Sequence, residues 1–472
     1  MTLIGRSRER DLLQSCLDSP EAEFVAVYGR RRVGKTYLIR QFFSDSFVFY
    51  ATGLARGTKR EQLTVFHQAL SRFGARATSR PTTWLTAFQQ LIGLLDHVPR
   101  SGKHVVFLDE LPWFDTQRSG FVTALEYFWN GYASARDDVI LVTCGSAASW
   151  MINTVIRNYG GLHNRVTVPI HIAPFTLAET EKYMAARGVV MNRYQLLEAH
   201  MIFGGVPYYL RHFNRRLGLA QNVDRLCFEE NAPLRSEYET MFRSLFRHSE
   251  RHRRIVEALA TKPSGYDREE LAAATQTPKG GVLTRVLTEL EESGFIRTTT
   301  PFGKKRKGTV YQLADAFSLF HLTFLAEPPD PSFWTRFTMT PRHSAWSGLA
   351  FEQVCVNHLP QIKRALGIAG VTTRQSGWRT TATADHPGAQ IDMVIDRADG
   401  VINLCEMKYT AGEFALTAAS ARAARERREL FRTVTATKSA LHLTLVTPYG
   451  LIRNGWTDTF QQIVTADDLF AT

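Results

Sequence analysis

The chain has 472 residues, of which 44% are hydrophobic and 22% are charged. This balance excludes a disordered or fibrous protein, and the length exceeds what one hydrophobic core usually holds, so we expect about three domains. The formal net charge of +12 favours a polyanionic partner such as nucleic acid, although a basic surface without such a partner would give the same charge balance.

The sequence shows no sign of membrane insertion or secretion. No apolar stretch approaches the ~20 residues of a membrane span, and the first ten residues lack the hydrophobic segment of a signal peptide. The cysteines are scattered and form no C-x-x-C pair, which argues against a disulfide framework and a zinc site. We therefore expect a cytoplasmic protein. The cysteines are Cys16, Cys144, Cys227, Cys355 and Cys405.

A glycine-rich segment near the N-terminus carries the clearest chemical signal. Residues 29–36 match G-x-x-x-x-G-K-[ST], with an apolar strand expected at 24–28 and an amphipathic helix at 37–43. A loop in this position turns backbone N–H groups and a helix N-terminus toward the phosphates of ATP. Lys35 would reach these phosphates and Thr36 would hold Mg²⁺. The residues predicted to bind nucleotide here are Gly29, Arg30, Arg31, Arg32, Val33, Gly34, Lys35, Thr36 and Tyr37.

A second strand completes the pattern expected of an ATP-hydrolysing site. Residues 104–108 are predominantly apolar and lead into Asp109 and Glu110, which is the Walker B pattern. We expect Asp109 to bind Mg²⁺ through water and Glu110 to orient or deprotonate the attacking water.

The next strand is expected at residues 139–144, followed by a polar turn. Either Thr143 or Ser146 would lie between the two carboxylates and the γ-phosphate, and we favour Ser146, although an ordinary helix cap at Ser146 explains it equally well. Arg165 could touch the γ-phosphate, but a plain surface arginine is the better interpretation. With strands at 46–52 and 165–172 and helices at 59–73 and 82–98, these elements predict a doubly wound sheet.

The middle of the chain predicts a winged helix-turn-helix. Helices are expected at 251–261, 267–275 and 279–293, followed by a strand, a basic turn and a second strand within 295–313. A recognition helix could enter a major groove while the lysines and arginine of 304–307 meet phosphates, so we favour DNA as the partner. A lid or protein-contact module with a solvated charged turn remains the alternative.

The C-terminal part contains a second set of candidate catalytic residues. Prolines at 328, 329 and 331 mark a boundary, and Glu352 lies on a predicted helix at 349–359. Asp392 begins a strand, and Glu406 and Lys408 share one face of the next strand. These carboxylates form a hard-oxygen site suited to Mg²⁺, held by Asp392 and Glu406, with Lys408 orienting water. A salt bridge between Lys408 and Glu406 is the purely structural alternative.

A basic helix follows this second site. It could track a phosphate backbone or simply form a solvated face. Its arginines are Arg422, Arg425, Arg427, Arg428 and Arg432.

Taken together, these motifs resemble an AAA+-related ATPase family first recognised in archaea, close to the signal-transduction (STAND) ATPases. The resemblance implies that residues 4–9 lie near the adenine and that Pro207, in a Gly-Gly-x-Pro lid segment, senses the nucleotide. The order Glu352, Asp392, Glu406, Lys408 resembles the PD-(D/E)xK nucleases, a domain that recurs in this ATPase family. The resemblance rests on residues 4–9, 28–36, 108–110, 144–146 and 203–210.

We therefore predict an α/β protein with four parts. They are a P-loop ATPase core and lid (1–210), a helical region with a winged helix-turn-helix (211–325), a linker (326–342) and a nuclease-like domain (343–472). The expected function is ATP hydrolysis coupled to Mg²⁺-dependent DNA cleavage, with homo-oligomerisation possible. A non-cleaving DNA-binding ATPase and a STAND-like switch that binds protein partners are the alternatives.

Overall fold

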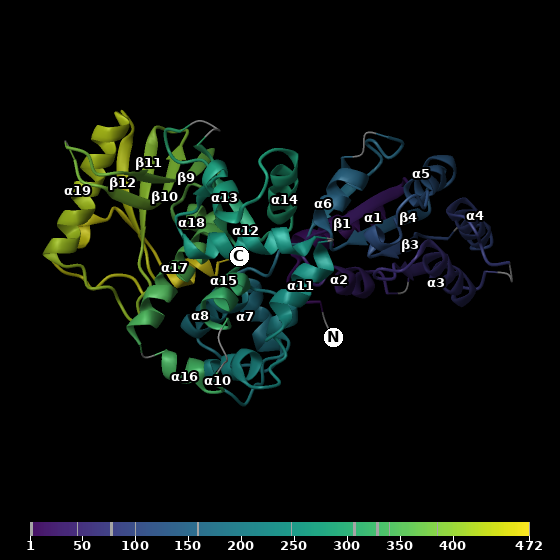
Figure 1. Ribbon diagram of the computed structural model, residues 1–472, viewed down its shortest axis with the longest axis horizontal. Helices are drawn as coiled ribbons and strands as arrows, with labels where there is room; N and C mark the ends of the chain where they lie inside the picture. The colour runs from purple at the N-terminus through teal and green to yellow at the C-terminus, as the bar shows by residue number, and fades with distance from the viewer. Residues whose placement is uncertain are drawn as a thin grey trace. The chain divides into compact units, whose positions relative to one another are not determined.

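The computed structural model describes residues 3–44, 46–75, 79–99, 101–157, 160–246, 248–304, 308–326, 330–338, 340–384 and 386–471. The chain divides into two compact units, Met1–Ala173 and Pro174–Thr472. Figure 1 shows the elements of both units, and each unit is described by itself.

The first unit is built on a five-stranded sheet with the order β2-β3-β4-β1-β5, and all neighbouring strands are parallel. The predicted doubly wound sheet is thus present, and each predicted strand lies within three residues of its expected start. The elements are α1 (Ser7–Asp18), β1 (Glu23–Tyr28), α2 (Lys35–Phe42), β2 (Phe47–Thr52), α3 (Lys59–Arg72), α4 (Trp84–Leu95), β3 (His104–Asp109), η1 (Leu111–Trp113), α5 (Phe121–Gly131), η2 (Ala133–Ala135), β4 (Val139–Gly145), α6 (Ala148–Trp150), η3 (Met151–Ile156) and β5 (Val168–His171).

Two hydrophobic cores fix this sheet, one on each face. Along β1, Phe24 and Ala26 pack into the core formed with α3, α4 and α5, whereas Val25 and Val27 pack into the core formed with α1 and α2. Because successive side chains of a strand point to opposite faces, a strand covered on both faces reads as a continuous apolar run. This is why the sequence identified β1 and β4 so directly.

The second unit begins with helices that the sequence had assigned to the ATPase lid. Their core residues, including Leu197, Phe203 and Tyr209, belong to the same cluster as Phe351, Met393 and Val446 further along the chain. The unit boundary therefore lies at 173/174 and differs from the predicted boundary at residue 210. These elements are α7 (Leu177–Ala186), α8 (Arg193–Phe203), α9 (Pro207–Leu210), α10 (Leu219–Val223), η4 (Asp224–Phe228), α11 (Glu237–Leu245), α15 (Ala316–Phe324) and α16 (Phe333–Phe337).

The predicted linker, 326–342, is partly structured. Residues 327–329 lie outside the described residues, but α16 forms within the predicted linker and its Trp334 is fully buried. Asp224 fixes the start of α16. Its carboxylate accepts hydrogen bonds from the backbone N–H of Trp334 at 2.7 Å and from the hydroxyl of Thr335 at 2.6 Å. Aromatic side chains, rather than prolines, therefore determine the packing within this stretch.

The middle module, residues 249–313, packs around a hydrophobic core that it shares with α11 and with Leu319 of α15. Its three strands form an antiparallel sheet with the order β6-β8-β7, and the predicted helices and strands are all present. Of the predicted basic run 304–307, residues 305–307 lie outside the described residues. The elements are α12 (Ser249–Thr261), β6 (Tyr266–Asp267), α13 (Arg268–Thr275), α14 (Gly281–Glu292), β7 (Ile296–Thr299) and β8 (Val310–Leu313).

The C-terminal module, residues 341–471, contains a mixed five-stranded sheet with the order β13-β12-β11-β10-β9. Strands β9, β10 and β11 run antiparallel, whereas β11, β12 and β13 run parallel. Helix α17 packs with one face of the sheet and α19 with the other. The elements are α17 (Pro341–Asn357), α18 (Leu359–Ala365), β9 (Thr373–Thr380), β10 (Ala389–Arg397), β11 (Val401–Met407), α19 (Ala418–Thr435), β12 (Ala440–Val446), η6 (Thr457–Thr459), β13 (Gln462–Val464) and α20 (Ala466–Leu469).

All five cysteines are buried and carry free thiols, as the lack of pairing motifs predicted. Within the described part of the chain, no helix combines the length and the hydrophobicity that crossing a bilayer requires.

Candidate functional site

The predicted phosphate loop connects β1 to α2. Gly29 has φ +140°, and a Cβ there would lie 2.3 Å from the carbonyl oxygen of Ile172, so a side chain is excluded. Gly34 has φ +94° and caps α2. Lys35 is the first residue of α2, and its Nζ donates to the carbonyl oxygens of Gly29 and Arg30, each at 2.9 Å. Burial lowers the pKa of this lysine, since desolvation disfavours its charge.

The remaining loop residues differ in exposure. Arg30 and Val33 are buried, whereas Tyr37 is 44% exposed. The Nη2 of Arg6, in the N-terminal box, donates to the carbonyl oxygen of Val33 at 3.1 Å, so the box supports the loop directly. Arg31 and Arg32 are partly exposed, and Arg32 adopts a positive φ of 73°.

Thr36 and Asp109 meet beneath the loop. The Thr36 Oγ1 donates to both carboxylate oxygens of Asp109, at 3.0 and 3.1 Å. Burial, followed by the charge of Glu110, raises the pKa of Asp109 to about 6. A hydroxyl and a carboxylate at the end of a buried strand are the hard-oxygen donors that suit Mg²⁺. These residues therefore fit the predicted metal role, and Mg²⁺ bound there would polarise the phosphates.

Ser146 connects the loop to Glu110. Its Oγ accepts from Lys35 Nζ at 3.1 Å and donates to Glu110 Oε1 at 2.6 Å, while its backbone N–H donates to Glu110 Oε2 at 3.2 Å. Thr143, the other predicted candidate, is fully buried, and its hydroxyl donates to the Val25 carbonyl within the sheet at 3.3 Å. The geometry therefore places Ser146, and not Thr143, between the lysine and the carboxylate.

The C-terminal candidates come from three elements, namely α17 with Glu352, β10 with Asp392 and the end of β11 with Glu406 and Lys408. Burial and then the charge of Asp392 raise the pKa of Glu352 to about 8. Burial and then the charge of Glu406 raise the pKa of Asp392. The three carboxylates thus influence one another electrostatically, as expected for side chains that converge on one region.

Cations already engage Glu406. Its Oε1 lies 2.8 Å from Lys408 Nζ, and its Oε2 lies 2.8 Å from Arg427 Nη2 of α19. Among the described residues, no group of three or more His, Cys, Asp or Glu side chains is arranged to hold a metal ion. The donor chemistry suits Mg²⁺, but Glu406 would have to release one of its ion pairs before it could coordinate a metal.

Residues 3–213 match the family model described as an ATPase domain predominantly from Archaea. This region is similar to that ATPase domain. Over 400 residues the chain is also 21% identical to an uncharacterised protein of Methanocaldococcus jannaschii, covering 83% of each chain. The match to the family model agrees with the resemblance that the N-terminal motifs indicated.

Two solved structures are matched over 68% of this chain. The Walker-type ATPase PABY2304 of Pyrococcus abyssi is 17% identical, with a TM-score of 0.47, over 68% of this chain and 96% of that chain. The ORC2 protein of Aeropyrum pernix, in ADPNP–ADP complexes, is 14% identical, with a TM-score of 0.45, over 68% of this chain and 93% of that chain.

Two predicted residues of the ATPase region lie apart from the loop in the sequence. Pro207, in the second unit, is the first residue of α9 and lies two positions after Gly205. A Cβ at Gly205 would lie 2.2 Å from the carbonyl oxygen of Phe175, so the glycine is required by packing. Arg165 is exposed on the first unit.

Two arginines at the C-terminal site were not predicted. Arg427 contacts Glu406, although in the sequence it is only one of several arginines on a predicted basic helix. Arg297 lies on β7 of the middle module, and its charge acts on Glu352. Neither has a sequence signal of its own, because the contacts depend on how α19 and β7 pack on the C-terminal sheet.

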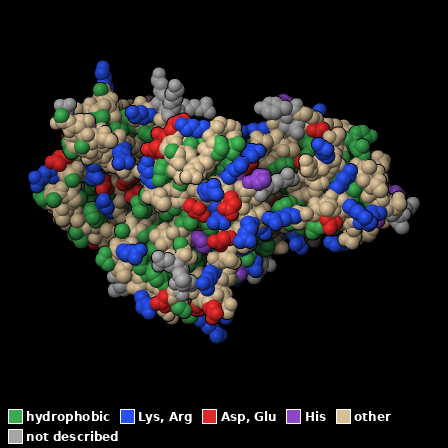
Figure 2. All heavy atoms as spheres, in the orientation of Figure 1, with side chains coloured by type: hydrophobic (Ala, Val, Ile, Leu, Met, Phe, Trp, Pro, Cys, Tyr) green, Lys and Arg blue, Asp and Glu red, His purple; other side chains and the backbone are tan. Residues whose placement is uncertain are grey.

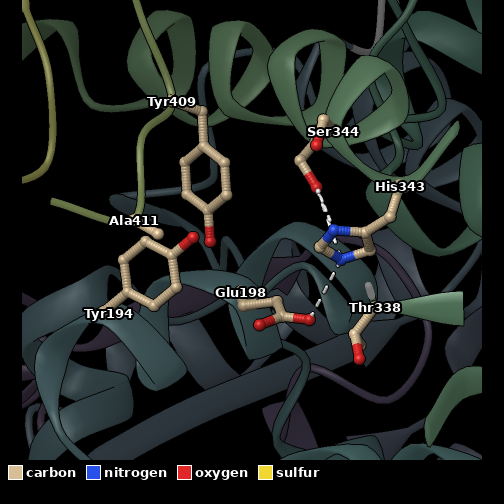
Figure 3. A pocket seen from close by; sticks show the side chains of 8 residues that line it. Tyr194, Glu198, Thr338, His343, Ser344, Tyr409 and Ala411 are labelled. Atoms are coloured by element: carbon tan, nitrogen blue, oxygen red, sulfur yellow. Dashed lines mark hydrogen bonds and ion pairs between the residues drawn. The ribbon is translucent and has the colours of Figure 1, made fainter. Parts of the chain in front are cut away.

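A cavity of about 310 Å³ lies in the second unit, and its lining was not predicted (Figure 3). The Nε2 of His343 is 3.4 Å from Oε1 of Glu198, and the rings of Tyr194 and Tyr409 stack with centroids 5.1 Å apart. Tyr409 follows Lys408 directly in the sequence. One lining residue of the cavity is therefore adjacent in the chain to a residue of the C-terminal site. The lining consists of Tyr194, Glu198, Thr338, His343, Ser344, Ser347, Tyr409 and Ala411.

Proposed function

We propose that this protein binds and hydrolyses ATP at the N-terminal site and uses the nucleotide to control DNA binding and cleavage by the second unit. The observation that carries the first part is the continuous set of contacts from Lys35 through Ser146 to Glu110, beside the pair formed by Thr36 and Asp109. Such an arrangement supplies phosphate binding, metal binding and water activation in one place.

Each residue of the proposed ATP site would have a separate role in hydrolysis. Backbone N–H groups of the loop and the N-terminus of α2 would bind the phosphates, and Lys35 would exchange its carbonyl partners for phosphate oxygens. Glu110 would orient the attacking water and accept its proton as the terminal P–O bond breaks. Ser146 would hold Glu110 and sense the γ-phosphate.

Glu110→Gln and Lys35→Ala separate these roles. We expect Glu110→Gln to bind ATP with near-normal affinity but to hydrolyse it at least about 100-fold more slowly, because a general base contributes a factor of that size. Lys35→Ala should lose binding itself. Fluorescent-nucleotide binding and phosphate release, measured on the full chain, test both, and a Glu110→Gln protein with normal turnover would contradict the assignment.

DNA binding is supported by the charge of the chain and by the middle module. The order of helices and strands in this module is the one expected of a winged helix, and in that interpretation α14 would be the recognition helix. Arg285 on α14 and Arg251 and Arg254 on α12 are exposed. Figure 2 shows Lys and Arg side chains over the face in view, interspersed with Asp and Glu. We therefore expect local phosphate contacts rather than one broad basic field.

Salt dependence tests this proposal. If arginines bind phosphates, a gel shift with duplex DNA should weaken strongly between low and physiological salt, because counterions are released on binding. Arg285→Ala should reduce both the affinity and the slope. The absence of any DNA affinity at low salt would favour the alternative, a STAND-like switch that binds protein partners.

Cleavage is proposed at the C-terminal site, by analogy with PD-(D/E)xK nucleases. Asp392 and Glu406 would hold Mg²⁺, with Glu352 as a third carboxylate, and the metal would activate water and polarise the phosphodiester. Lys408 would orient that water and stabilise the charge that develops as the P–O bond breaks. Supercoiled plasmid with Mg²⁺ and ATP should be nicked by the wild-type chain and not by Asp392→Asn or Lys408→Ala. Salt-sensitive DNA binding without nicking would instead support a non-cleaving DNA-binding ATPase.

A further inference from the structure

Polar side chains from three parts of the chain line the cavity of the second unit (Figure 3). Tyr194 and Glu198 lie four residues apart on α8, and His343 and Ser347 lie four residues apart on α17. Because residues four apart share one side of a helix, each helix turns a single face toward the cavity. Tyr409, in the segment after β11, also lines it. The volume of about 310 Å³ is within the range of pockets that hold small molecules.

The cavity extends from the surface to a buried carboxylate. Two of its lining residues, Ser344 and Ala411, are exposed, whereas Glu198, His343 and Ser347 are each at least nine-tenths buried. A molecule that enters past the exposed residues would therefore meet a carboxylate, an imidazole and a hydroxyl at the inner end.

Glu198 is the charged residue at this inner end. Its Oε1 is buried and has no hydrogen-bond partner in the part of the chain that the structure describes. The Nε2 of His343 lies 3.4 Å away, farther than the ~2.8 Å of a charge-assisted hydrogen bond. The rings of Trp334, Phe337 and Trp346 pack around the His343 ring and hold it in this position. Since buried oxygens normally have a donor, this one is available to a donor on a bound molecule.

The other lining groups favour a positively charged occupant. Among the eight described lining residues there is no lysine or arginine. The rings of Tyr194 and Tyr409 stack on each other, so they turn phenol oxygens rather than ring faces toward the cavity (Figure 3). A carboxylate and several hydroxyls can all accept hydrogen bonds from a cation, whereas an anion would meet the charge of Glu198.

We propose that this cavity binds a small organic cation whose ammonium group donates to Glu198. An ammonium group carries three N–H donors and no acceptor, which matches a carboxylate flanked by hydroxyls. Glu198 would hold the charged end, and the apolar part of the ligand would extend toward the exposed Ser344 and Ala411. Such a site is independent of the proposed DNA cleavage.

Isothermal titration calorimetry on the full chain without nucleotide tests this site. The probes are n-butylammonium, 1-butanol and butyrate, which are similar in size and differ in charge. We expect n-butylammonium to bind, and the neutral and anionic probes to bind at least about tenfold more weakly, because charge-assisted hydrogen bonds are roughly twice as strong as neutral ones.

Two variants locate the binding. Glu198→Gln keeps the shape of the side chain without its charge and should weaken n-butylammonium binding at least about tenfold. Glu230→Gln, an exposed charge loss in the same unit, should bind like wild type. Ser344→Trp places a bulky ring at an exposed position of the lining and should block entry, so it decides the question if Glu198→Gln does not fold.

Three results would refute the proposal. The first is that the wild-type chain binds no n-butylammonium up to about 10 mM, a generous limit for so small a ligand. The second is that butyrate binds as well as n-butylammonium. The third is that binding is unchanged by Glu198→Gln or by Ser344→Trp in folded protein. Water alone would then be the occupant of the cavity.

Discussion

Ser146 makes two side-chain contacts in the ATPase domain, with Lys35 at 3.1 Å and with Glu110 at 2.6 Å. We expect Ser146→Ala to reduce ATP turnover by about 100-fold, the effect of misplacing a general base, while nucleotide affinity changes little. Thr143→Val is the matched control, because its hydroxyl lies within the sheet. Steady-state phosphate release distinguishes the two variants, and equal losses in both would contradict a special role for Ser146.

The raised pKa of Asp109 predicts how the effect of Mg²⁺ on ATP binding changes with pH. Its carboxyl has a pKa of about 6, raised by burial and by Glu110, so it is ionised above pH 6 and protonated below. The tightening of ATP binding by Mg²⁺ should therefore weaken about tenfold for each pH unit below 6, because the protonated carboxyl is a poor metal ligand. Titrations from pH 8 to 5, with and without Mg²⁺, measure this. Asp109→Asn serves as the control for titration of ATP itself and should lack the additional pH dependence.

The sequence predicted those parts of the sites whose geometry is local. The spacing of Gly29, Gly34 and Lys35 specifies a loop and a helix start within eight residues, so the pattern fixes the geometry. Arg427 could not be found in this way, because it reaches Glu406 from a separate element, α19. Ser146 and Thr143 were both candidates, and the choice between them required the strand register that places the Thr143 hydroxyl against Val25.

At the scale of elements, one histidine connects α7 to α17. The Nε2 of His358 accepts the Leu177 N–H at 3.1 Å, and its Nδ1–H donates to the Val354 carbonyl at 2.8 Å. Only a neutral imidazole can make both bonds. Burial lowers the pKa of His358 and, to a greater extent, that of its ring neighbour His200. Both histidines therefore remain neutral in the folded chain under conditions that protonate them when unfolded.

The sign of the resulting pH effect follows from these lowered values. Below about pH 6.5 the unfolded histidines take up protons that the folded ones do not, so the free energy of unfolding declines as pH falls, by up to about 1.4 kcal/mol per pH unit for each histidine. Denaturant unfolding of the second unit at pH 7.5 and 5.5 measures the decline. It should be smaller in His358→Gln, whereas His248→Gln, an exposed histidine, should match wild type. An identical decline in all three would exclude this linkage.

Hydrophobic periodicity predicted where the helices and strands lie, but it did not always predict the residues at which they begin. Helix α17 begins at Pro341, eight residues before the predicted start, because Thr340 caps it and accepts the N–H of His343. The prolines near 330 suggested a break, yet Trp334 and Phe337 order α16 by packing into the large core of the second unit. Tertiary burial of aromatic residues overrode the local signal in both places, and only the folded chain contains that information.

For the whole molecule, the division at 173/174 predicts where the chain can be cut. A protein ending at residue 173 retains all five strands and both cores of the first unit, so we expect a soluble, cooperatively unfolding domain. One ending at residue 213 would expose Leu197, Phe203 and Tyr209, which normally pack in the second unit's core, and should aggregate. Size-exclusion chromatography and thermal unfolding of the two truncated chains compare them. A soluble, monomeric 1–213 protein would argue against the shared core.

The same shared core has a mechanical consequence. The matched ATPase region ends at residue 213, but the segment from 174 onward is packed with α17 and the C-terminal sheet. Because close-packed side chains transmit displacement, any motion of this segment would move the sheet that carries Asp392 and Glu406 with it. Helices α7 to α9 and the C-terminal sheet would then move together as one body.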